Sequence, residues 1–412
     1  MGQFAEIFLG ILTAMGGFVE IGELTFTLQA GSHFSYQLLW VVALATVGIM
    51  VYCEMAGRVA AVKHRPVFSL IRERAGFSAA LATLIAANLV NLLTCTAEIG
   101  GVAMLWQLMS GWPYRALLFA ALAFFVLVVW LTSFKWIERV FGLGGLLMVV
   151  FVVAVWQMGP DWQQLAAGFV PRPPETNEPR AGLMYAYVAV ALMSSIMLPY
   201  ETYFYASGGI EDEWKPKDIG LNRVVVIIGF ALGAMLAVTL VALGAEFFAP
   251  RRIEPQLPGT AAMGAAAVFG KLGLWIALLG LFFAFAGAAI ETALSGAYNL
   301  AQFAGWPWGK HKRPREAGRF SLAWIAMFTI GTIVVMTGVD PVKIVEYSIV
   351  FSVVVLPFTY FPVLVVAKDK TIMGEHANGP FANVLGWFYL VMITLTALAA
   401  IPLFLATHGG RG

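Results

Sequence analysis

The stretch Gly17–Phe26 reads GFVEIGELTF and contains two glutamates within a long apolar segment. A second apolar segment contains a third glutamate, Glu201, two residues after Pro199. Acidic side chains are costly at membrane depth, and they usually mark a functional site there. Gly22 and Pro199 are of the residue types that interrupt or kink helices. We therefore expect a helix break beside the acids in both segments, and a polar site where the two breaks meet.

The composition is that of an integral membrane protein. Of the 412 residues, 60% are hydrophobic and only 12% are charged, and the mean hydropathy is +0.83. A net charge of +2, without basic and aromatic residues interleaved, gives no support for a nucleic-acid partner. The sequence contains no phosphate-binding loop, nucleophile elbow or zinc-protease motif, so we do not expect an enzyme.

Apolar runs long enough to cross about 30 Å of hydrocarbon predict about eleven membrane-spanning helices in an all-α protein. The expected spans are roughly 4–31, 37–60, 78–108, 114–133, 137–158, 182–207, 220–248, 272–303, 320–337, 345–366 and 384–406. The connections that would share a side with the amino terminus carry most of the lysines and arginines. By the positive-inside rule, the amino terminus should be cytoplasmic, in a plasma or bacterial inner membrane.

The first and sixth spans are five crossings apart, an odd number, so a five-helix repeat would be inverted. The residues Glu23–Phe26 can be aligned with Glu201–Phe204, which superimposes the two expected breaks. Inverted repeats with broken helices are typical of secondary transporters that bind substrate near the midplane. We expect one transmembrane domain, 1–412, with repeats at about 4–158 and 182–366 and an extra helix at about 384–406.

Three acids and free backbone carbonyls at helix breaks would suit a cation. Glu20 and Glu23 lie too deep in their span to reach water easily, although a glutamate near a span end can simply face the headgroups. Glu98 and Glu291 are further intramembrane acids. They would either line a proton or ion path or pack toward serine, threonine or buried water.

Glu54 and Arg58 are four residues apart near the end of a span, and thus lie on one helix face. The two side chains are expected to form a structural ion pair, or to extend toward the headgroups.

Three stretches resemble the Nramp divalent metal transporters of the amino acid, polyamine and organocation superfamily. Gly17–Trp40 is similar to the family stretch that is built around a DPGN motif, and Ala97 and Glu98 are similar to its DLAEVIG segment. Leu356–Gly374, LPFTYFPVLVVAKDKTIMG, is similar to the family's LPFAxxPL stretch and the MG that follows it. The resemblance covers nearly the whole chain and implies a LeuT-like fold with broken first and sixth spans, and alternating access.

At the metal site, the resemblance implies an altered ligand set. The family's aspartate, proline, glycine and asparagine correspond to Glu20–Glu23, and its methionine, proline and histidine correspond to Leu198–Tyr200. Backbone carbonyls near Ile21 and Ser195 would complete the coordination. Without the thioether, and with more carboxylates, the site should favour hard ions such as Mg²⁺ or Mn²⁺ over softer metals. A magnesium-transporting branch of the family has also lost the methionine.

The resemblance also implies altered proton coupling. The family's second span 6 histidine corresponds to Tyr205, and its span 3 aspartate corresponds to Cys95, whereas the span 3 glutamate remains as Glu98. None of the five histidines lies at membrane depth, so carboxylates would have to carry protons. Mutual repulsion would keep at least one of the three site acids protonated before a cation binds. Whether transport is proton-coupled therefore stays open.

The main hypothesis is a secondary transporter or facilitator of divalent cations, with the metal as substrate, no cofactor, and the bilayer as its surroundings. The alternative on the same fold is an organic cation or polyamine transporter, because aromatic rings flank the acids. These rings, Phe26, Tyr200, Tyr203 and Tyr205, can equally be ordinary bundle packing. A receptor that binds a ligand without moving it is a third possibility, and the oligomeric state is left open.

Overall fold

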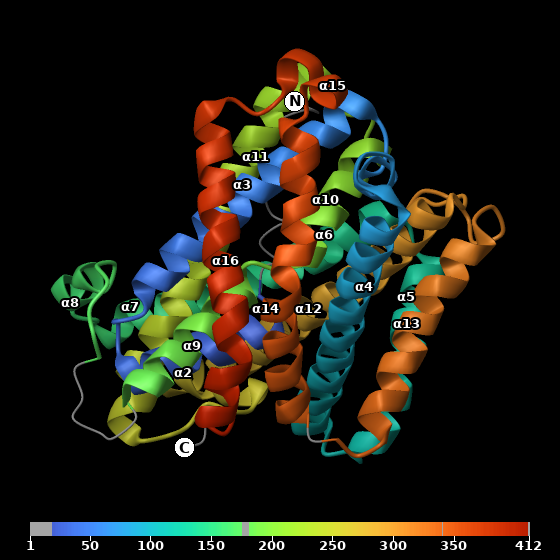
Figure 1. Cartoon of the computed structure of the whole chain (residues 1–412). Helices are drawn as coiled ribbons and strands as arrows, with labels where there is room; N and C mark the ends of the chain where they lie inside the picture. The colour runs from blue at the N-terminus through green and yellow to red at the C-terminus, as the bar shows by residue number, and fades with distance from the viewer. Residues whose placement is uncertain (1–18, 175–180, 340, 411–412) are drawn as a thin grey trace.

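The computed structural model describes residues 19–174, 181–339 and 341–410, and these ranges form a helical bundle (Figure 1). Within them, ten helices are long and apolar enough to cross a membrane. The first expected span lies largely outside the described residues, and only its second part is seen, as α2 (Ile21–Phe34). The expectation of an all-α membrane protein is confirmed.

The other spans follow the predicted order along the chain. They are α3 (Leu39–Lys63), α4 (Val67–Ser110), α5 (Tyr114–Leu131), α6 (Phe134–Gly145) with α7 (Val149–Met158), α9 (Ala181–Ile196) with α10 (Pro199–Glu211), α11 (Ile219–Leu243), α12 (Ala262–Ala304), α13 (Gly318–Met336), α14 (Pro341–Lys368) and α16 (Pro380–Ala406). Short connecting helices include α8 (Trp162–Ala167) and α15 (Lys370–Met373).

Two helices are longer than their apolar runs predicted, because each continues beyond a kink at a glycine. The backbone of Gly76 in α4 has φ 86° and ψ 170°, and that of Gly270 in α12 has φ 60° and ψ −144°. Glycine adopts these conformations with little strain because it has no Cβ. The segment 249–270, between the seventh and eighth expected spans, consists of two 3₁₀ turns followed by the first part of α12.

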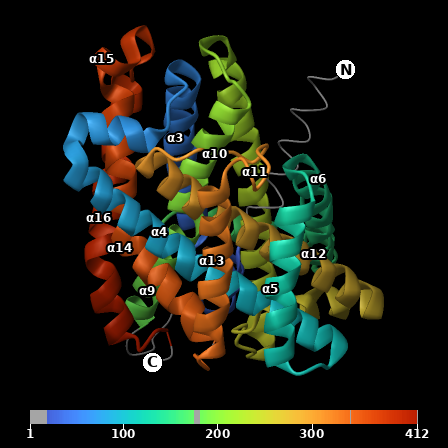
Figure 2. The same cartoon turned by 90° about the vertical axis from the view of Figure 1, so that its right-hand side faces the viewer.

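The long helices α4 and α12 pack against each other in the centre of the bundle, and α14 packs on α4. The outer helices α5 and α13 lie side by side, and α16 lies against α14 (Figure 2). Large apolar side chains are exposed on the outer helices, for example Leu131 on the C-terminal end of α5 and Leu398 on α16. Such a surface is suited to contact with lipid rather than water.

The helix α2 meets the end of α11 at a backbone-to-backbone contact. There, the chain forms a π-helical turn, η3 (Gly244–Phe248), of the kind that often occurs at functional sites. A Cβ added to Gly31 would lie 1.9 Å from the Val241 carbonyl oxygen, so a glycine is required. Beside this contact, the Tyr36 hydroxyl donates a hydrogen bond to the Glu246 carboxylate. Burial and this hydrogen bond raise the pKa of Tyr36.

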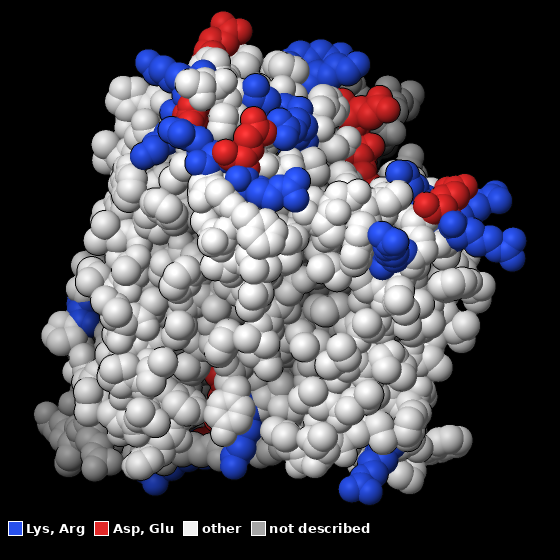
Figure 3. Space-filling view, turned by 45° about the vertical axis from the view of Figure 1, so that its right-hand side comes forward, with Lys and Arg blue, Asp and Glu red and all other residues white. Residues whose placement is uncertain are grey.

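Charged side chains are distributed unevenly along the bundle. In Figure 3, most lysines, arginines and acids gather at the end that carries α15, and a wide, largely uncharged band lies below them. We call the charged end the α15 end. An uncharged band between two polar ends is the surface expected of a protein that spans a bilayer.

Candidate functional site

The sixth expected span is interrupted beside Pro199. The helix α9 ends at Ile196 and α10 begins at Pro199, and the intervening Leu198 has an extended backbone with φ −82° and ψ 125°. Proline is favoured in the first turn of a helix, because it needs no hydrogen-bond partner for a backbone N–H. The sequence Leu198–Pro199 therefore ends one helix and starts the next, which leaves Glu201 in the first turn of α10.

In the first span, the non-helical residues precede Gly22. Val19 and Glu20 are not helical, and Glu20 caps α2 with an extended backbone, φ −83° and ψ 166°. Gly22 itself is helical, so the non-helical residues lie about two positions before the predicted break. Its lack of a side chain serves packing instead, since a Cβ there would lie 2.6 Å from Ile349 Cδ1 in α14.

A small cavity lies between the two interrupted segments and their neighbours α3 and α11. It measures about 20 Å³, which is room for roughly one water molecule. Its lining consists of Glu23, Thr46, Ile196, Glu201, Phe230, Gly233 and Ala234. Two predicted acids thus face one cavity. Thr46 was missed, because a single threonine in an apolar span is common and carries no distinguishing sequence signal.

The third acid, Glu20, is not part of this lining and lies near Glu98 of α4. One Glu98 oxygen, Oε1, accepts a hydrogen bond of 2.7 Å from the Ile21 backbone N–H, at the start of α2. The Glu20 and Glu98 carboxylates interact electrostatically, and both are buried. The sequence did not predict that Glu98 would hold the first free N–H of a helix.

The intramembrane acids thus form two groups, Glu23 with Glu201 and Glu20 with Glu98. Within the described ranges, no three His, Cys, Asp or Glu side chains are grouped closely enough to hold a metal ion. The three acids that were expected to bind one ion together do not converge in this conformation. Glu201 still interacts electrostatically with Glu23 and Glu20, so the two groups belong to one acidic region.

Several buried polar atoms in this region have no hydrogen-bond partner. They include the Oε2 atoms of Glu20, Glu98 and Glu201, and the Tyr200 hydroxyl. Buried polar groups are paired in most proteins, and exceptions occur where a ligand or water binds. The unpaired oxygens are hard donors, and they are concentrated where the two interrupted segments meet. This region is therefore chemically suited to a cation.

The two backbone positions expected to complete the coordination, near Ile21 and Ser195, differ in their surroundings. The Ile21 carbonyl accepts a hydrogen bond of 2.7 Å from the Thr25 hydroxyl. The Ser195 hydroxyl donates to the Leu192 carbonyl at 3.0 Å, and the cavity is lined by the next residue, Ile196. Ser195 is thus adjacent in sequence to a lining residue, and Ile21 lies two residues before another, Glu23.

The residues of the expected proton or ion path are also separate from the cavity. Glu291 of α12 interacts electrostatically with Glu201 and with Glu138 of α6. Tyr205 points elsewhere, because its hydroxyl donates to Asn222 Oδ1 at 2.8 Å. Of these two, only Glu291 lies in electrostatic contact with the acidic region.

The aromatic residues near the acids pack against other rings. Phe26 makes an edge contact with Tyr187, and Tyr203 stacks on Phe68 at 4.8 Å between ring centroids. The Tyr203 hydroxyl donates to the Thr359 carbonyl. None of these rings lines the 20 Å³ cavity. Phe26 and Tyr203 are therefore packing residues in this conformation, whereas Phe230 of α11 lines the cavity.

The sequence was compared with known proteins. Residues 10–402 match the family described as "Natural resistance-associated macrophage protein-like" (Nramp). The divalent metal cation transporter MntH of Deinococcus radiodurans is 26% identical over 397 residues, which cover 94% of this chain and 87% of that protein. The MntH protein of Ralstonia nicotianae is 26% identical over 416 residues, with coverages of 94% and 88%.

The fold was compared with solved structures. The manganese transporter of Eremococcus coleocola, in complex with an aromatic bis-isothiourea substituted compound, superposes with a TM-score of 0.79. At 19% identity, the match covers 98% of this chain and 87% of that one. MhsT in complex with L-phenylalanine superposes with a TM-score of 0.63 at 15% identity, covering 96% of this chain and 97% of that one. The LeuT-like fold expected from the sequence is thereby confirmed.

Proposed function

Because the chain belongs to the Nramp family, we propose that it moves divalent metal cations across its membrane by alternating access around the acidic region. Two relatives that cover 94% of the chain are divalent metal cation transporters. The observation that carries the proposal is the cavity that joins Glu23 and Glu201 at the interrupted segments. The metal ion is the substrate, and the bilayer is the only further partner proposed.

The cavity chemistry favours hard cations. Its lining supplies two carboxylates and the Thr46 hydroxyl, and no sulfur side chain is among the described lining residues. Carboxylate, hydroxyl and carbonyl oxygens suit Mg²⁺ and Mn²⁺, whereas thioethers select softer metals. We propose Glu23 and Glu201 as direct ligands, with Glu20 binding the ion's water or entering the coordination after rearrangement. This chain would be a divergent family member, near the magnesium-transporting branch.

An organic cation is less well supported. The cavity of about 20 Å³ admits a single water-sized species, whereas a polyamine has several heavy atoms in a row. Phe26 and Tyr203 pack against the rings of Tyr187 and Phe68, which leaves Phe230 as the one aromatic residue among the described lining residues. A receptor that transports nothing would use the same site, so only flux measurements separate it from a transporter.

We also propose an orientation and a repeat organisation. The α15 end would face the cytoplasm, with the amino terminus on the same side, because lysines and arginines gather there (Figure 3). The membrane would be the plasma or bacterial inner membrane. The inverted repeats at about 4–158 and 182–366 are supported by the similarity to proteins with LeuT-like folds.

The test is ion flux into liposomes containing the purified protein, with Mn²⁺, Mg²⁺, Ca²⁺ and spermidine offered in turn. Glu23→Gln and Glu201→Gln should each lower Mn²⁺ or Mg²⁺ uptake about 10- to 100-fold, the effect of losing one charged ligand. Glu375→Gln is the matched control, because the Glu375 side chain is 88% exposed. Repeating the assay with a pH gradient shows whether protons are coupled.

Unchanged metal binding and flux in both site variants would rule out the proposed ligands. Spermidine uptake without metal uptake would favour the organic-cation alternative. Metal-dependent thermal stabilisation without any flux would identify a receptor instead.

A further inference from the structure

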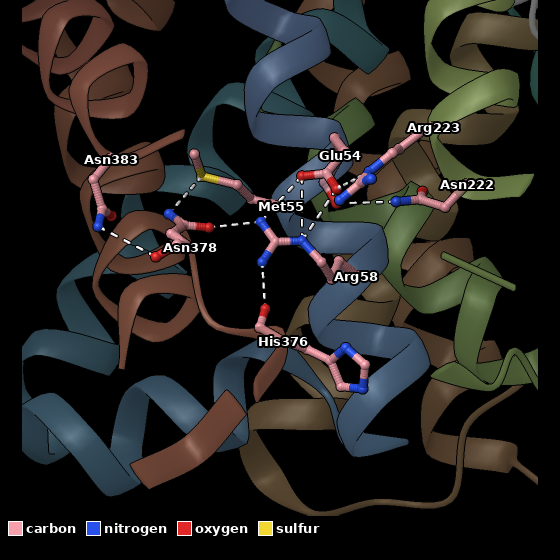
Figure 4. Close-up of polar contacts among 8 residues, drawn as sticks. All are labelled: Glu54, Met55, Arg58, Asn222, Arg223, His376, Asn378 and Asn383. Carbon is pink, nitrogen blue, oxygen red and sulfur yellow. Dashed lines mark hydrogen bonds and ion pairs between the residues drawn. The ribbon is translucent and has the colours of Figure 1, made fainter. Parts of the chain in front are cut away.

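A polar cluster at the α15 end is centred on Arg58 of α3 (Figure 4). The Arg58 side chain is 6% exposed, and its guanidinium forms an ion pair of 3.1 Å with Glu54, as the spacing predicted. It also donates to two groups beyond α3, the His376 carbonyl oxygen and Asn378 Oδ1, each at 2.6 Å. One buried planar donor therefore joins α3 to the connector between α15 and α16.

The same cluster continues from α3 to α10 and α11. The Asn222 side-chain amide donates to the Glu54 backbone carbonyl at 3.0 Å, and its oxygen accepts the Tyr205 hydroxyl at 2.8 Å. A Cβ added to Gly57 would lie 2.2 Å from Asn222 Oδ1, so glycine is needed for this close approach. The cluster thus holds the α15 ends of α3, α10 and α11 together.

These three helices also form most of the cavity wall. On α3, Thr46 lies about two helical turns before Glu54. On α10, Glu201 lies one turn before Tyr205 and on the same face. On α11, Phe230 is also a lining residue. A change in how the cluster holds these helices would therefore be transmitted along rigid elements to the cavity.

The connector links the cluster to α14, which contacts α2, α9 and α10, the helices of the two interrupted segments. The Asn378 backbone N–H donates to the Ala367 carbonyl at the end of α14, at 2.9 Å. Further along α14, the Ile349 carbonyl accepts the Ser194 hydroxyl of α9, and the Ile349 side chain fills the space left by Gly22. Arg58 is therefore placed between the helices of the cavity wall and the helix that packs over both interrupted segments.

We propose that Arg58 is a positioning residue that limits access to the cavity from the α15 end, because it fastens α3, and through it α10 and α11, to the connector between α15 and α16. This inference rests on the proposed function, since it assigns a gate to the same cavity. Arginine suits the role because its planar guanidinium donates hydrogen bonds to Glu54, His376 and Asn378 at the same time. Lysine is a single compact charge and cannot replace all three bonds.

The experiment measures how quickly a cavity residue reacts from the α15 side. Ala234→Cys places a small thiol in the cavity wall, and the natural Cys53 and Cys95 are fully buried, which keeps background labelling low. A membrane-impermeant methanethiosulfonate reagent is applied to vesicles in both orientations. Adding Arg58→Met removes the bonds to Glu54, His376 and Asn378 together, so labelling from the α15 side should rise at least about fivefold, the population shift that loss of a single hydrogen bond produces.

Two further variants separate gating from general stability. Arg58→Lys, which retains the charge alone, should give an intermediate labelling rate. Arg223→Met is the matched control, because Arg223 also contacts Glu54, at 3.2 Å, but its side chain is 61% exposed and makes no described contact with the connector. Its labelling should stay within about twofold of the Ala234→Cys parent, because exposed ion pairs contribute little.

Unchanged labelling in folded Arg58→Met would overturn the proposal, and so would an equal increase in Arg223→Met. If Arg58→Met does not fold, Asn378→Leu removes one of the two bonds from Arg58 to the connector, together with the Asn378 contact with Met55 Sδ, and must give a smaller increase on the same side. Labelling requires no transport, so the assay tests the proposed role of Arg58 even if the protein moves no metal. The outcome is therefore independent of the flux assay for the proposed function.

Discussion

At the scale of single residues, Thr46 offers the most direct test of the cavity. Thr46 lines the cavity beside Glu23 and Glu201, and its hydroxyl donates a hydrogen bond of 2.7 Å to the Val42 carbonyl within the same helix. Thr46→Val removes the oxygen and keeps the shape. We expect cation affinity to fall about fivefold, the effect of one lost neutral oxygen contact, with thermal stability nearly unchanged.

Isothermal calorimetry with Mn²⁺ measures this affinity. Thr239→Val is the matched control, because Thr239 of α11 also donates to the carbonyl four residues earlier but lies outside the cavity lining. An equal loss in both variants would mean that threonine hydroxyls matter for helix geometry here, and not for the ion.

Glu98 gives a second residue-scale prediction, on stability. Its carboxylate accepts the Ile21 N–H, which would otherwise be an unpaired buried donor. Glu98→Leu should lower the free energy of unfolding by about 1–3 kcal/mol, whereas Glu98→Gln keeps an acceptor and should cost less. Thermal unfolding in detergent compares the two variants. Equal losses in the two variants would show that the Ile21 contact contributes nothing measurable.

Residue identity alone predicted the acids but not their partners. Glu23 and Glu201 stood out because carboxylates are rare in apolar spans, and they line one cavity. The position of Glu20 depends on where α2 begins, and tertiary packing decides that. The non-helical residue is Glu20 itself, two residues before Gly22, where the sequence had predicted the break. Thr46 could not be selected, because threonines in spans commonly bond to their own helix.

At the scale of elements, the contact between α2 and η3 should tolerate no side chain. A Cβ at Gly31 would lie 1.9 Å from the Val241 carbonyl and 2.8 Å from the Gly244 Cα, and backbone cannot rotate away as a side chain can. Gly31→Ala should therefore separate the two elements and lower stability by about 1–3 kcal/mol or more. Thermal unfolding and Mn²⁺ flux would both report the change.

Gly220→Ala is the control for helix propensity, since a Cβ there meets nothing within 4 Å. At this site in α11, alanine should be neutral or stabilising. A Gly31→Ala protein as stable as Gly220→Ala would show that α2 and η3 can move apart at little cost.

Element ends were harder to predict than element cores. The apolar run of α4 gave no reason to begin before residue 78, because Arg72, Glu73 and Arg74 precede it. The helix nevertheless starts at Val67 and passes through the kink at Gly76. Hydropathy reports where a helix meets lipid, and a helix continues into a polar region wherever its backbone bonds can form.

At the scale of the whole molecule, the proposed orientation predicts opposite labelling of the two ends. Glu375→Cys lies in the connector at the α15 end, and Gln163→Cys lies in α8, where the side chain is exposed. An impermeant thiol reagent added to intact cells should label Gln163→Cys and leave Glu375→Cys unmodified. The reverse result would invert the topology and place the amino terminus outside.

The overall fold was the most predictable level, because composition and span order already indicate a helical membrane transporter. The three acidic side chains beside the two expected helix breaks likewise indicated that the substrate is a cation. The arrangement of the acids into two groups was not predictable, since Glu98 and Glu20 are brought together by packing between α4 and α2.

The small size of the cavity bears on the hydration of the ion that we propose as substrate. A space of about 20 Å³ cannot contain an ion with a full hydration shell, so each turnover would include stripping and rebuilding of that shell. Mg²⁺ gives up its water more reluctantly than larger divalent ions. Uptake of Mg²⁺ should therefore have a higher activation enthalpy than uptake of Mn²⁺, even if both ions bind equally well. The speed of the protein would then be governed by the ion's own water exchange, and cooling would discriminate between substrates that affinity does not.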